Sequence, residues 1–276
     1  MDQVLWMDSG IHTQSPVFPI AMDEALANSM AEADSKPIVH LWVYERALFL
    51  GRRDARLPNL EAALRTTAKN GYGALLRSSG GACVPLDAGV LNIAILLPNL
   101  SVTIDEFFRL AATMLQEGLE SYGKIEVGEV TGSYCVGDYD FAINGKKIGG
   151  MAQRRTRYGS ILQLCINIEG SGLERGLLME NFYQEAGLHL MENNKPIPFI
   201  DATTIGSITE LAGRHVTVDE VKTSLWDSFC QTHKAEQVPF RLNVSAFEQA
   251  KQHLQDKLQL FSFTAREIME ETWRLP

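Results

Sequence analysis

The sequence predicts an α+β fold, in which a mixed β-sheet is flanked by helices and followed by a helical C-terminal segment. Three patterns support this prediction. Short apolar segments alternate with amphipathic helical segments as far as about residue 173, an Asn-Gly dipeptide joins two of the apolar segments, and capping-box sequences dominate from there on.

The first hundred residues are expected to contain two helices and four strands. An apolar face at helical spacing predicts a helix over residues 19–33, and Pro58 with Asn70-Gly71 marks the ends of a second over 58–69. The strands are expected at residues 39–45, 48–52, 74–78 and 90–97, with the glycine-bearing loop 79–89 between the last two.

The middle of the chain is expected to form a helix, a hairpin and two further strands. Thr103 and Glu106 have capping-box spacing and open a helix that runs to about residue 122. Asn144-Gly145 is typical of a two-residue hairpin turn, which would pair Phe141 with Ile148 and point Lys147 to the opposite face. The strands are expected at residues 124–130, 140–143, 146–153 and 160–168.

The C-terminal part is expected to be helical. Further capping-box sequences begin at Ser207, Thr217, Ser245 and Thr264. The composition loosens around Val238-Pro239, so we expect a main domain over residues 1–238 and a helical extension over 239–276.

Composition and charge restrict the class of protein. With 276 residues, 45% of them hydrophobic and 21% charged, the chain can bury a core that needs no disulfides. The net charge of −9 argues against nonspecific nucleic-acid binding, which needs a basic surface. The longest apolar run, residues 90–98, is too short to span a bilayer, and the first ten residues do not resemble a signal peptide.

The four cysteines have irregular spacing, which fits neither a zinc site nor a disulfide framework. We therefore expect a cytoplasmic protein with reduced thiols, no bound metal, and neither nucleic acid nor membrane as a partner.

Cys135 is the strongest candidate nucleophile. Gly132 and Gly137 flank it in a loop, where glycines let the backbone bend sharply and let a ligand approach. Of the other cysteines, Cys83 lies in the glycine-bearing loop and is the rival nucleophile. Cys165 lies within a strand and Cys230 has helical spacing with apolar neighbours, so both are expected to be packing residues.

Lys147 is the candidate partner of this thiol. Ala142 and Gly149, its expected neighbours on the same face, are small and leave room for a substrate. If the loop curls back at Gly137, the amine reaches the sulfur and favours the thiolate, which forms thioesters with acyl donors. Alternatively, Lys146 and Lys147 only protect an edge strand. A patch that could dock an acidic protein, or simply be a solvated strand end, comprises Lys146, Lys147, Arg154, Arg155 and Arg157.

The glycine-bearing loop begins with Arg77, Ser79, Gly80 and Gly81 and leads to Asn92. It opens onto a strand and lacks a Gly-Lys-Ser/Thr sequence, so it is neither a P-loop nor a dinucleotide-binding fingerprint. Its backbone amides could contact a ligand carbonyl, although a plain strand connection would have the same sequence. The six histidines have no triad spacing with Cys135.

Together these motifs resemble the lipoate–protein ligase and octanoyltransferase family, which is related to the biotin protein ligases. The resemblance lies in residues 77–81, Leu91-Asn92, residues 145–150 and residues 152–155, within a match that extends over about residues 20–225. It implies a biotin/lipoyl ligase-like catalytic domain. The segment from Ser133 to Asp140 resembles the branch that moves octanoyl groups between proteins in protein lipoylation.

The resemblance also implies roles and partners. Cys135 would carry the acyl thioester and Lys147 would favour its thiolate form. The donor would be the octanoylated H protein of the glycine cleavage system. The acceptors would be lipoyl domains of 2-oxoacid dehydrogenase acyltransferase subunits, and no cofactor would be required. The residues expected to bind substrate are Arg77, Ser79, Gly80, Gly81, Asn92, Gly149, Gly150 and Gln153.

Three alternatives remain. ATP-dependent ligases share this fold, but they tend to carry His-Asp after the glycine loop and Gly-Thr-Leu in a later strand, where this chain has Leu86-Asp87 and Gly159-Ser160-Ile161. The donor could instead be octanoyl-acyl carrier protein. Finally, the chain could be a non-catalytic binder of lipoylated domains, in which Cys135 has no chemical role.

Overall fold

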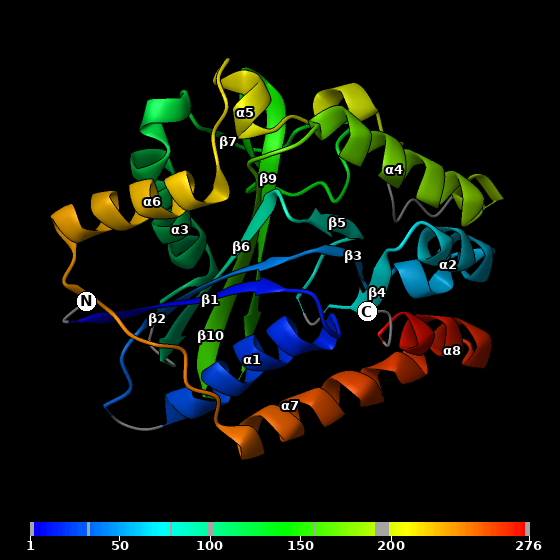
Figure 1. Cartoon of the computed structure of the whole chain (residues 1–276), viewed down its shortest axis with the longest axis horizontal. Helices are drawn as coiled ribbons and strands as arrows, with labels where there is room; N and C mark the ends of the chain where they lie inside the picture. The colour runs from blue at the N-terminus through cyan, green and yellow to red at the C-terminus, as the bar shows by residue number, and fades with distance from the viewer. Residues whose placement is uncertain are drawn as a thin grey trace.

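The computed structural model describes residues 3–31, 34–77, 79–98, 102–156, 158–190 and 199–273 (Figure 1). Its strands are β1 (Val4–His12), β2 (Ile38–Tyr44), β3 (Arg46–Leu50), β4 (Gly73–Leu76), β5 (Val84–Asp87), β6 (Val90–Pro98), β7 (Glu126–Val127), β8 (Phe141–Ile143), β9 (Lys146–Arg155), β10 (Gly159–Asn167) and β11 (Ala235–Gln237).

The α-helices are α1 (Val17–Asn28), α2 (Leu60–Lys69), α3 (Ile104–Gly118), α4 (Gly172–Glu185), α5 (Ile208–Leu211), α6 (Val218–Thr232), α7 (Val244–Lys257) and α8 (Phe263–Thr272). Short 3₁₀ turns lie at Ser29–Ala31, Asp54–Arg56, Glu120–Tyr122, Leu188–Leu190, Ala202–Thr204 and Leu258–Leu260. No helix among the described residues is both long enough and apolar enough to cross a bilayer.

The strands form two sheets. The larger has the order β11-β1-β2-β6-β10-β9-β8-β7, and the smaller has the order β4-β3-β5. In the larger sheet β1 pairs in parallel with β2 and β11, while the remaining neighbours are antiparallel. This mixed sheet with flanking helices confirms the predicted α+β class.

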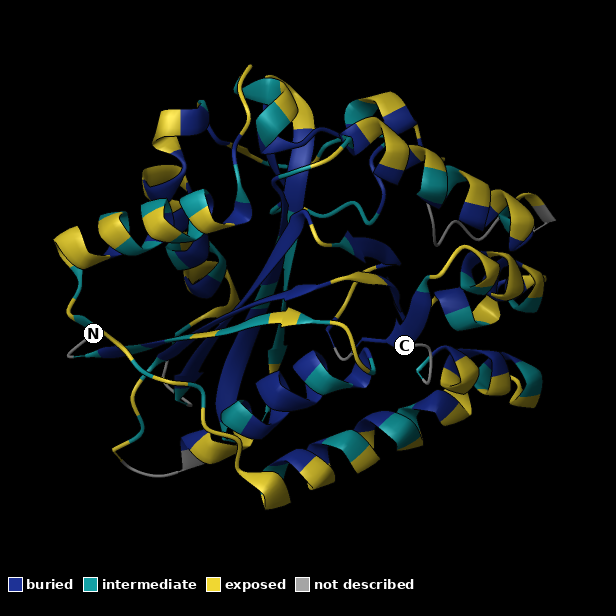
Figure 2. Ribbon diagram, viewed as in Figure 1, coloured by how far each residue is buried: buried dark blue, intermediate teal, exposed yellow. Residues whose placement is uncertain are grey.

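Helices cover both faces of the larger sheet. Core residues of α3 and α6 pack on one face, and those of α1 and α7 lie on the other (Figures 1 and 2). All seven residues of β2 are buried, which explains why this strand reads as a nearly continuous apolar run. On the right of Figure 1, helices α2, α4 and α8 surround the smaller sheet.

The C-terminal helices share a core with the rest of the chain. Phe247 and Leu254 of α7 are buried in the same cluster as Ile20 and Met22 of α1. Trp273, just after α8, donates a hydrogen bond of 2.7 Å to the carbonyl of Ala74. The division into a catalytic domain over residues 1–238 and a helical extension over 239–276 remains a prediction.

Several sequence predictions were wrong about element boundaries. The glycine-bearing loop contains a strand, β5, and the strand expected over 124–130 is reduced to β7. The predicted caps Ser245 and Thr264 both lie inside helices, because Asn243 and Ser262 cap α7 and α8 instead. The capping boxes at Thr103 and Ser207 are confirmed.

The hairpin has the predicted turn but a different register. Asn144 and Gly145 have φ values of 52° and 72°, and Ala142 pairs with Lys147 as expected. A bulge then places Phe141 opposite Gly149 instead of Ile148. A Cβ at Gly149 would lie 2.3 Å from Cζ of Phe141, so the ring occupies the space that a side chain would fill.

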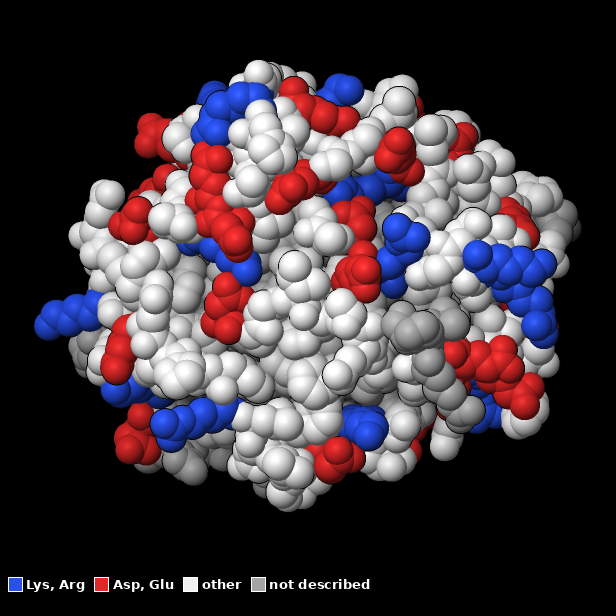
Figure 3. All heavy atoms as spheres, viewed as in Figure 1, with Lys and Arg blue, Asp and Glu red and all other residues white. Residues whose placement is uncertain are grey.

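The described members of the predicted basic patch do not form one surface. Lys147 is buried at 3% exposure in a strand between β10 and β8, so the expectation that it protects an edge strand is wrong. Arg154 turns toward Glu24, whereas Lys146 and Arg155 are exposed; Arg157 lies outside the described residues. On the face shown in Figure 3, basic and acidic side chains are interspersed.

Candidate active site

A cavity of about 520 Å³ lies between the glycine-bearing loop, the Cys135 loop (residues 132–140) and one face of the larger sheet. It brings together segments that are far apart in the sequence. Every residue predicted to act in catalysis or substrate binding lines it: Arg77, Ser79, Gly80, Gly81, Asn92, Cys135, Lys147, Gly149, Gly150 and Gln153.

The floor of the cavity is formed by a row of paired residues on neighbouring strands of the larger sheet. Trp42, Asn92, Cys165 and Gly150 pair in register across β2, β6, β10 and β9. Gly150 in this row and Ala152 further along β9 have little or no side chain, which leaves space above the strands. The apolar walls include Ile20, Phe49, Val84, Phe108 and Leu164.

Cys135 is held in an unusual backbone conformation. Its φ is 49°, in the left-handed region that residues with a Cβ rarely adopt, at a cost of roughly 1–2 kcal/mol. Its half-buried Sγ accepts hydrogen bonds from Nη2 of Arg77 at 3.0 Å and from the backbone N–H of Ala82 at 3.3 Å. The sulfur therefore faces a cation and an oriented amide.

Arg77 is buried and also donates from Nη2 to the carbonyl of Ala82 at 2.6 Å. Burial lowers the pKa of the guanidinium, but the negative charge of Cys135 and the hydrogen bond to its sulfur outweigh it and raise the pKa overall. Gly81 makes this contact possible. With φ of +99°, a Cβ there would lie 2.1 Å from Arg77 Nη2 and 2.7 Å from Cys135 Sγ.

Lys147 occupies a different position from the one the sequence predicts. Its Nζ donates to the carbonyls of Tyr134 at 2.8 Å and Cys135 at 2.9 Å and pairs with Asp140 Oδ1 at 2.9 Å. These partners use all three N–H groups of the ammonium. Among the described residues, the cation in hydrogen-bond contact with the sulfur is thus Arg77, and Lys147 binds the backbone around Cys135.

The Cys135 loop does curl back at Gly137, as the prediction requires. Asp140 N donates to the carbonyl of Gly137 at 3.1 Å, and Gly137 N donates to Asp140 Oδ2 at 3.2 Å. Burial raises the pKa of Asp140, and the charge of Lys147 opposes that shift. Asp140 was not among the predicted site residues, although its position at the end of the loop and directly before β8 was a usable signal.

Backbone groups after residue 199 form hydrogen bonds with the start of the Cys135 loop and with β9. Asp201 N donates to the carbonyl of Gly132 at 2.7 Å, and Gly206 N donates to the carbonyl of Lys147 at 2.9 Å. Asn167 of β10 donates to the hydroxyl of Tyr134 at 3.2 Å. The loop is therefore fixed on both sides of its cysteine.

Tyr183 and Asp54 form a buried, hydrogen-bonded pair that contacts the glycine-bearing loop. The hydroxyl of Tyr183 donates to Asp54 Oδ1 at 2.9 Å and accepts from the backbone N–H of Cys83 at 2.9 Å. Gly51 N donates to Asp54 Oδ2 at 2.6 Å. Burial raises the pKa of Asp54 to about 6 despite these hydrogen bonds. No local sequence pattern indicates this pair, since the residues are 129 positions apart.

The other cysteines are less suited to nucleophilic attack. Cys83 is fully buried, and burial together with the charge of Asp54 raises its pKa well above its usual range. Cys165 lies in the cavity floor, where burial raises the pKa of its thiol. The prediction that Cys230 is a core residue is wrong, because its side chain is exposed on α6.

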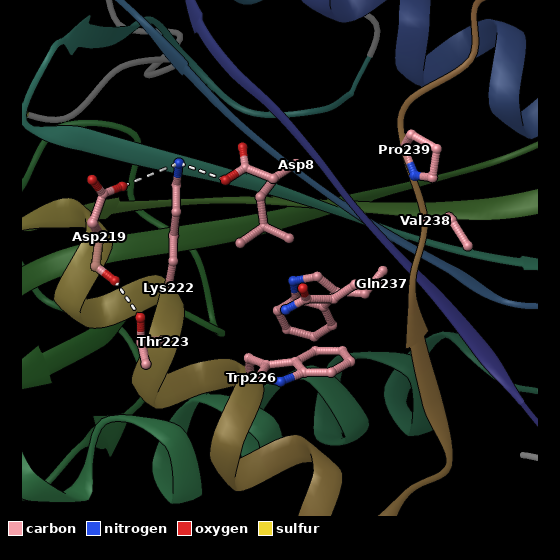
Figure 4. Close-up of a pocket in the computed structure, with 10 residues that line it drawn as sticks. Asp8, Asp219, Lys222, Thr223, Trp226, Gln237, Val238 and Pro239 are labelled. Atoms are coloured by element: carbon pink, nitrogen blue, oxygen red, sulfur yellow. Dashed lines mark hydrogen bonds and ion pairs between the residues drawn. The ribbon is translucent and has the colours of Figure 1, made fainter.

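A second cavity, of about 550 Å³, lies between β1, α6 and the chain after β11 (Figure 4). Lys222 Nζ lies 2.8 Å from Asp8 Oδ2 and 3.7 Å from Asp219 Oδ1 in its wall, and Trp6 and Trp226 pack edge to face. None of the predicted site residues lines it. The cavity that contains Cys135 is therefore the candidate active site.

Comparison with known sequences gives a consistent picture. A family model described as the lipoyl protein ligase A/B catalytic domain matches residues 15–230. Octanoyl-[GcvH]:protein N-octanoyltransferase from Geobacillus kaustophilus is 36% identical over 209 residues, which are 75% of this chain and 74% of that protein. The protein of the same name from Macrococcus caseolyticus is 39% identical over 208 residues, covering 75% of each chain.

Solved structures share the fold. Lipoate-protein ligase A bound with ATP has a TM-score of 0.71 at 18% identity, covering 97% of this chain and all of that one. A lipoate protein ligase from T. acidophilum with bound lipoic acid has a TM-score of 0.68 at 19% identity, covering 93% of this chain and 96% of that one.

Proposed function

The chain belongs to the lipoyl protein ligase A/B catalytic domain family, and on that basis we propose that it is an octanoyltransferase that carries the acyl group on Cys135. The donor is the octanoylated H protein of the glycine cleavage system, and the acceptors are lysines of lipoyl domains. Relatives that are 36% and 39% identical over about three quarters of the chain, and that bear the name of this reaction, support the assignment.

The observation that carries the chemical part of the proposal is the surroundings of the Cys135 sulfur. A guanidinium and a backbone N–H contact it, which favours the nucleophilic thiolate. The apolar walls beside it suit an alkyl chain, since each buried methylene contributes about 0.8 kcal/mol.

In the first half-reaction the thiolate attacks the carbonyl carbon of the octanoyl-lysine amide. A C–S bond forms, the C–N bond breaks, and the lysine nitrogen of the donor must take up a proton to leave as an amine. Ala82 N–H and Arg77 lie where they can stabilise the negative charge that moves from sulfur to oxygen.

In the second half-reaction the neutral amine of the acceptor lysine attacks the thioester. A new C–N bond forms, the C–S bond breaks and the thiolate is regenerated. The amine releases a proton to solvent water, which balances the proton that the donor lysine takes up from solvent water in the first half-reaction. One amide replaces another, so the exchange is close to thermoneutral and needs neither ATP nor a cofactor.

Lys147 acts as a positioning residue. Its ammonium holds the carbonyls of Tyr134 and Cys135, which stabilises the left-handed backbone that aims the sulfur at Arg77. Because its N–H groups are used in this way, it is not the acid that protonates the departing lysine. The floor under the substrate is formed by Gly149, Gly150 and Asn92. Gln153 lies on the side of the cavity next to α3.

A cytoplasmic location is part of the proposal, because a nucleophilic thiol persists in a reducing compartment. The described cysteines are all unpaired.

The test is a transfer assay without ATP. The protein is mixed with octanoylated H protein and an apo lipoyl domain, and the mass of each is followed. We expect the octanoyl mass to move from donor to acceptor. Formation of an adenylate from labelled ATP and free lipoate, or transfer only from octanoyl-acyl carrier protein, would contradict the proposal and favour the corresponding alternative.

A further inference from the structure

Two successive rows of the larger sheet lie under the active-site cavity. The first row is Trp42, Asn92, Cys165 and Gly150. It lies beside the Cys135 loop, because a Cβ at Gly150 would lie 2.9 Å from Asp140 Oδ1. Two residues further along each strand, on the same face and about 7 Å away, is a second row. This row, which we call the end row, is His40, Ala94, Gln163 and Ala152.

Helix α1 closes the cavity at the end row. It packs on β6 and β10 (Figure 1), and its residues Ile20 and Asp23 line the cavity at 2% and 0% exposure. The next row of the sheet, which includes Ile38, Leu96 and Ile161, is in one apolar cluster with Ala27 and Met30 of the α1 segment. The space above the sheet is therefore filled beyond the end row.

A buried carboxylate lies over the end row. Asp23 Oδ1 accepts a hydrogen bond from His40 Nδ1 at 2.7 Å, and Oδ2 accepts one from Gln163 Nε2 at 2.7 Å. These partners belong to β2 and β10, on either side of β6, where the small side chain of Ala94 leaves room for the carboxylate. The closed end of an otherwise largely apolar cavity is thus a polar group.

His40 is held in place from behind. Its side chain is fully buried, and its Nε2 lies 2.8 Å from Oγ of Ser9 on β1. The ring of Phe240 stacks on it, with the ring centroids 5.4 Å apart and an interplanar angle of 26°. Because both nitrogens of His40 are engaged and its ring is covered, Asp23 cannot move away from the cavity without breaking these buried contacts.

We propose that Asp23 determines the length of the acyl chain that the enzyme accepts. The chain on Cys135 lies over the first row, and its last carbons meet the carboxylate at the end row. The proposal rests on the proposed function, because it concerns the acyl group of the same site.

The physical basis is a competition between two effects at the closed end. In a pocket that stayed apolar, each further buried methylene would favour binding about fourfold, so longer chains would be preferred. A methylene offers no hydrogen bond to a carboxylate, and the space is already occupied by a group that two partners hold. Chains longer than octanoyl are therefore rejected.

The experiment compares acyl chains on the same donor protein. The rate at which Cys135 is acylated is measured by intact-protein mass spectrometry, with H protein that carries an octanoyl, a decanoyl or a dodecanoyl group. In the wild type we expect decanoyl to react at least roughly tenfold more slowly than octanoyl. Asp23→Ala opens space over the end row and should raise the ratio of the decanoyl to the octanoyl rate about tenfold.

The matched control is Asp105→Ala, which removes a carboxylate from the same cavity at an exposed position of α3. Its ratio of decanoyl to octanoyl rates should equal that of the wild type. Equal ratios in Asp23→Ala and Asp105→Ala, or a wild type that accepts all three chains equally well, would overturn the proposal.

A second variant decides the question if Asp23→Ala does not fold. Ala152→Val adds volume in the end row and leaves the hydrogen bonds of Asp23 in place, so it should favour hexanoyl over octanoyl relative to the wild type. An unchanged preference would show that the chain does not reach this row. Absence of any octanoyl adduct in the wild type would refute the proposed function itself, so the two failures are distinguishable.

Discussion

Nη2 of Arg77 lies 3.0 Å from Sγ of Cys135, in the position where the sequence predicts the amine of Lys147. The two cations have separate tasks in this arrangement. Arg77 contacts the sulfur, whereas Lys147 binds two carbonyls and Asp140 beneath the loop.

The separation of tasks predicts different effects of the two cations on the reactivity of Cys135. In Arg77→Gln, alkylation of Cys135 by iodoacetamide at neutral pH should be roughly tenfold slower, because no cation stabilises the thiolate. In Lys147→Met the rate should fall less than in Arg77→Gln, because Arg77 and the Ala82 N–H still contact the sulfur although the loop loses part of its support. A larger loss of rate in Lys147→Met than in Arg77→Gln would return the thiolate-stabilising role to the lysine.

Lys147 and Asp140 should be coupled in stability. Both side chains are 3% exposed, so Lys147→Met leaves a buried carboxylate without its partner and should lower the free energy of unfolding by about 3–5 kcal/mol. Lys147→Met combined with Asp140→Asn should recover part of that loss. Urea denaturation of the single and double variants measures the coupling, and strictly additive losses would argue against the pair.

The two glycines of the loop give a matched comparison. Gly81→Ala places a Cβ 2.7 Å from Cys135 Sγ at a positive φ, so transfer should fall at least tenfold. Gly80→Ala meets no atom within 4 Å and should lose less activity than Gly81→Ala. Steady-state transfer rates of the two variants provide the test. Equal activity would mean that the contact between the loop and the sulfur is not needed.

Asp54 should make stability depend on pH. Burial raises its pKa from 3.8 to about 6, so between those values the folded state binds more protons than the unfolded state. The contribution of Asp54 to the free energy of unfolding therefore decreases as pH rises through this window.

Asp54→Asn removes that titration. The difference in unfolding free energy, Asp54→Asn minus wild type, should increase by on the order of 3 kcal/mol from about pH 3 to about pH 7 and then level off. Urea denaturation at several pH values measures it. Parallel stability curves for the two proteins would show that the carboxyl does not titrate in this range.

Local patterns predicted much of the fold. The Asn144-Gly145 turn and the Thr103 capping box depend on neighbouring residues, and both are present. Pairing of β11 with β1 connects residues more than 200 positions apart, and β5 contains Pro85 within a glycine-bearing segment, so neither element has a local signal.

The sequence predicted which residues line the candidate site, but not which of them contact one another. The predicted residues all line one cavity, yet which cation meets the sulfur depends on the φ of Cys135 and on a contact across 58 positions. Sequence spacing fixes neither of these. The same applies to Asp54 and Tyr183, which share a hydrogen bond only because the smaller sheet packs against α4.

The central claim is that the sulfur of Cys135 carries the octanoyl group. Intact-protein mass spectrometry after mixing with octanoylated H protein, without ATP or acceptor, tests it most directly. We expect one hydroxylamine-sensitive octanoyl adduct in the wild type and in Cys83→Ala, and none in Cys135→Ala. An adduct that persists in Cys135→Ala, or that is lost in Cys83→Ala, would contradict the claim.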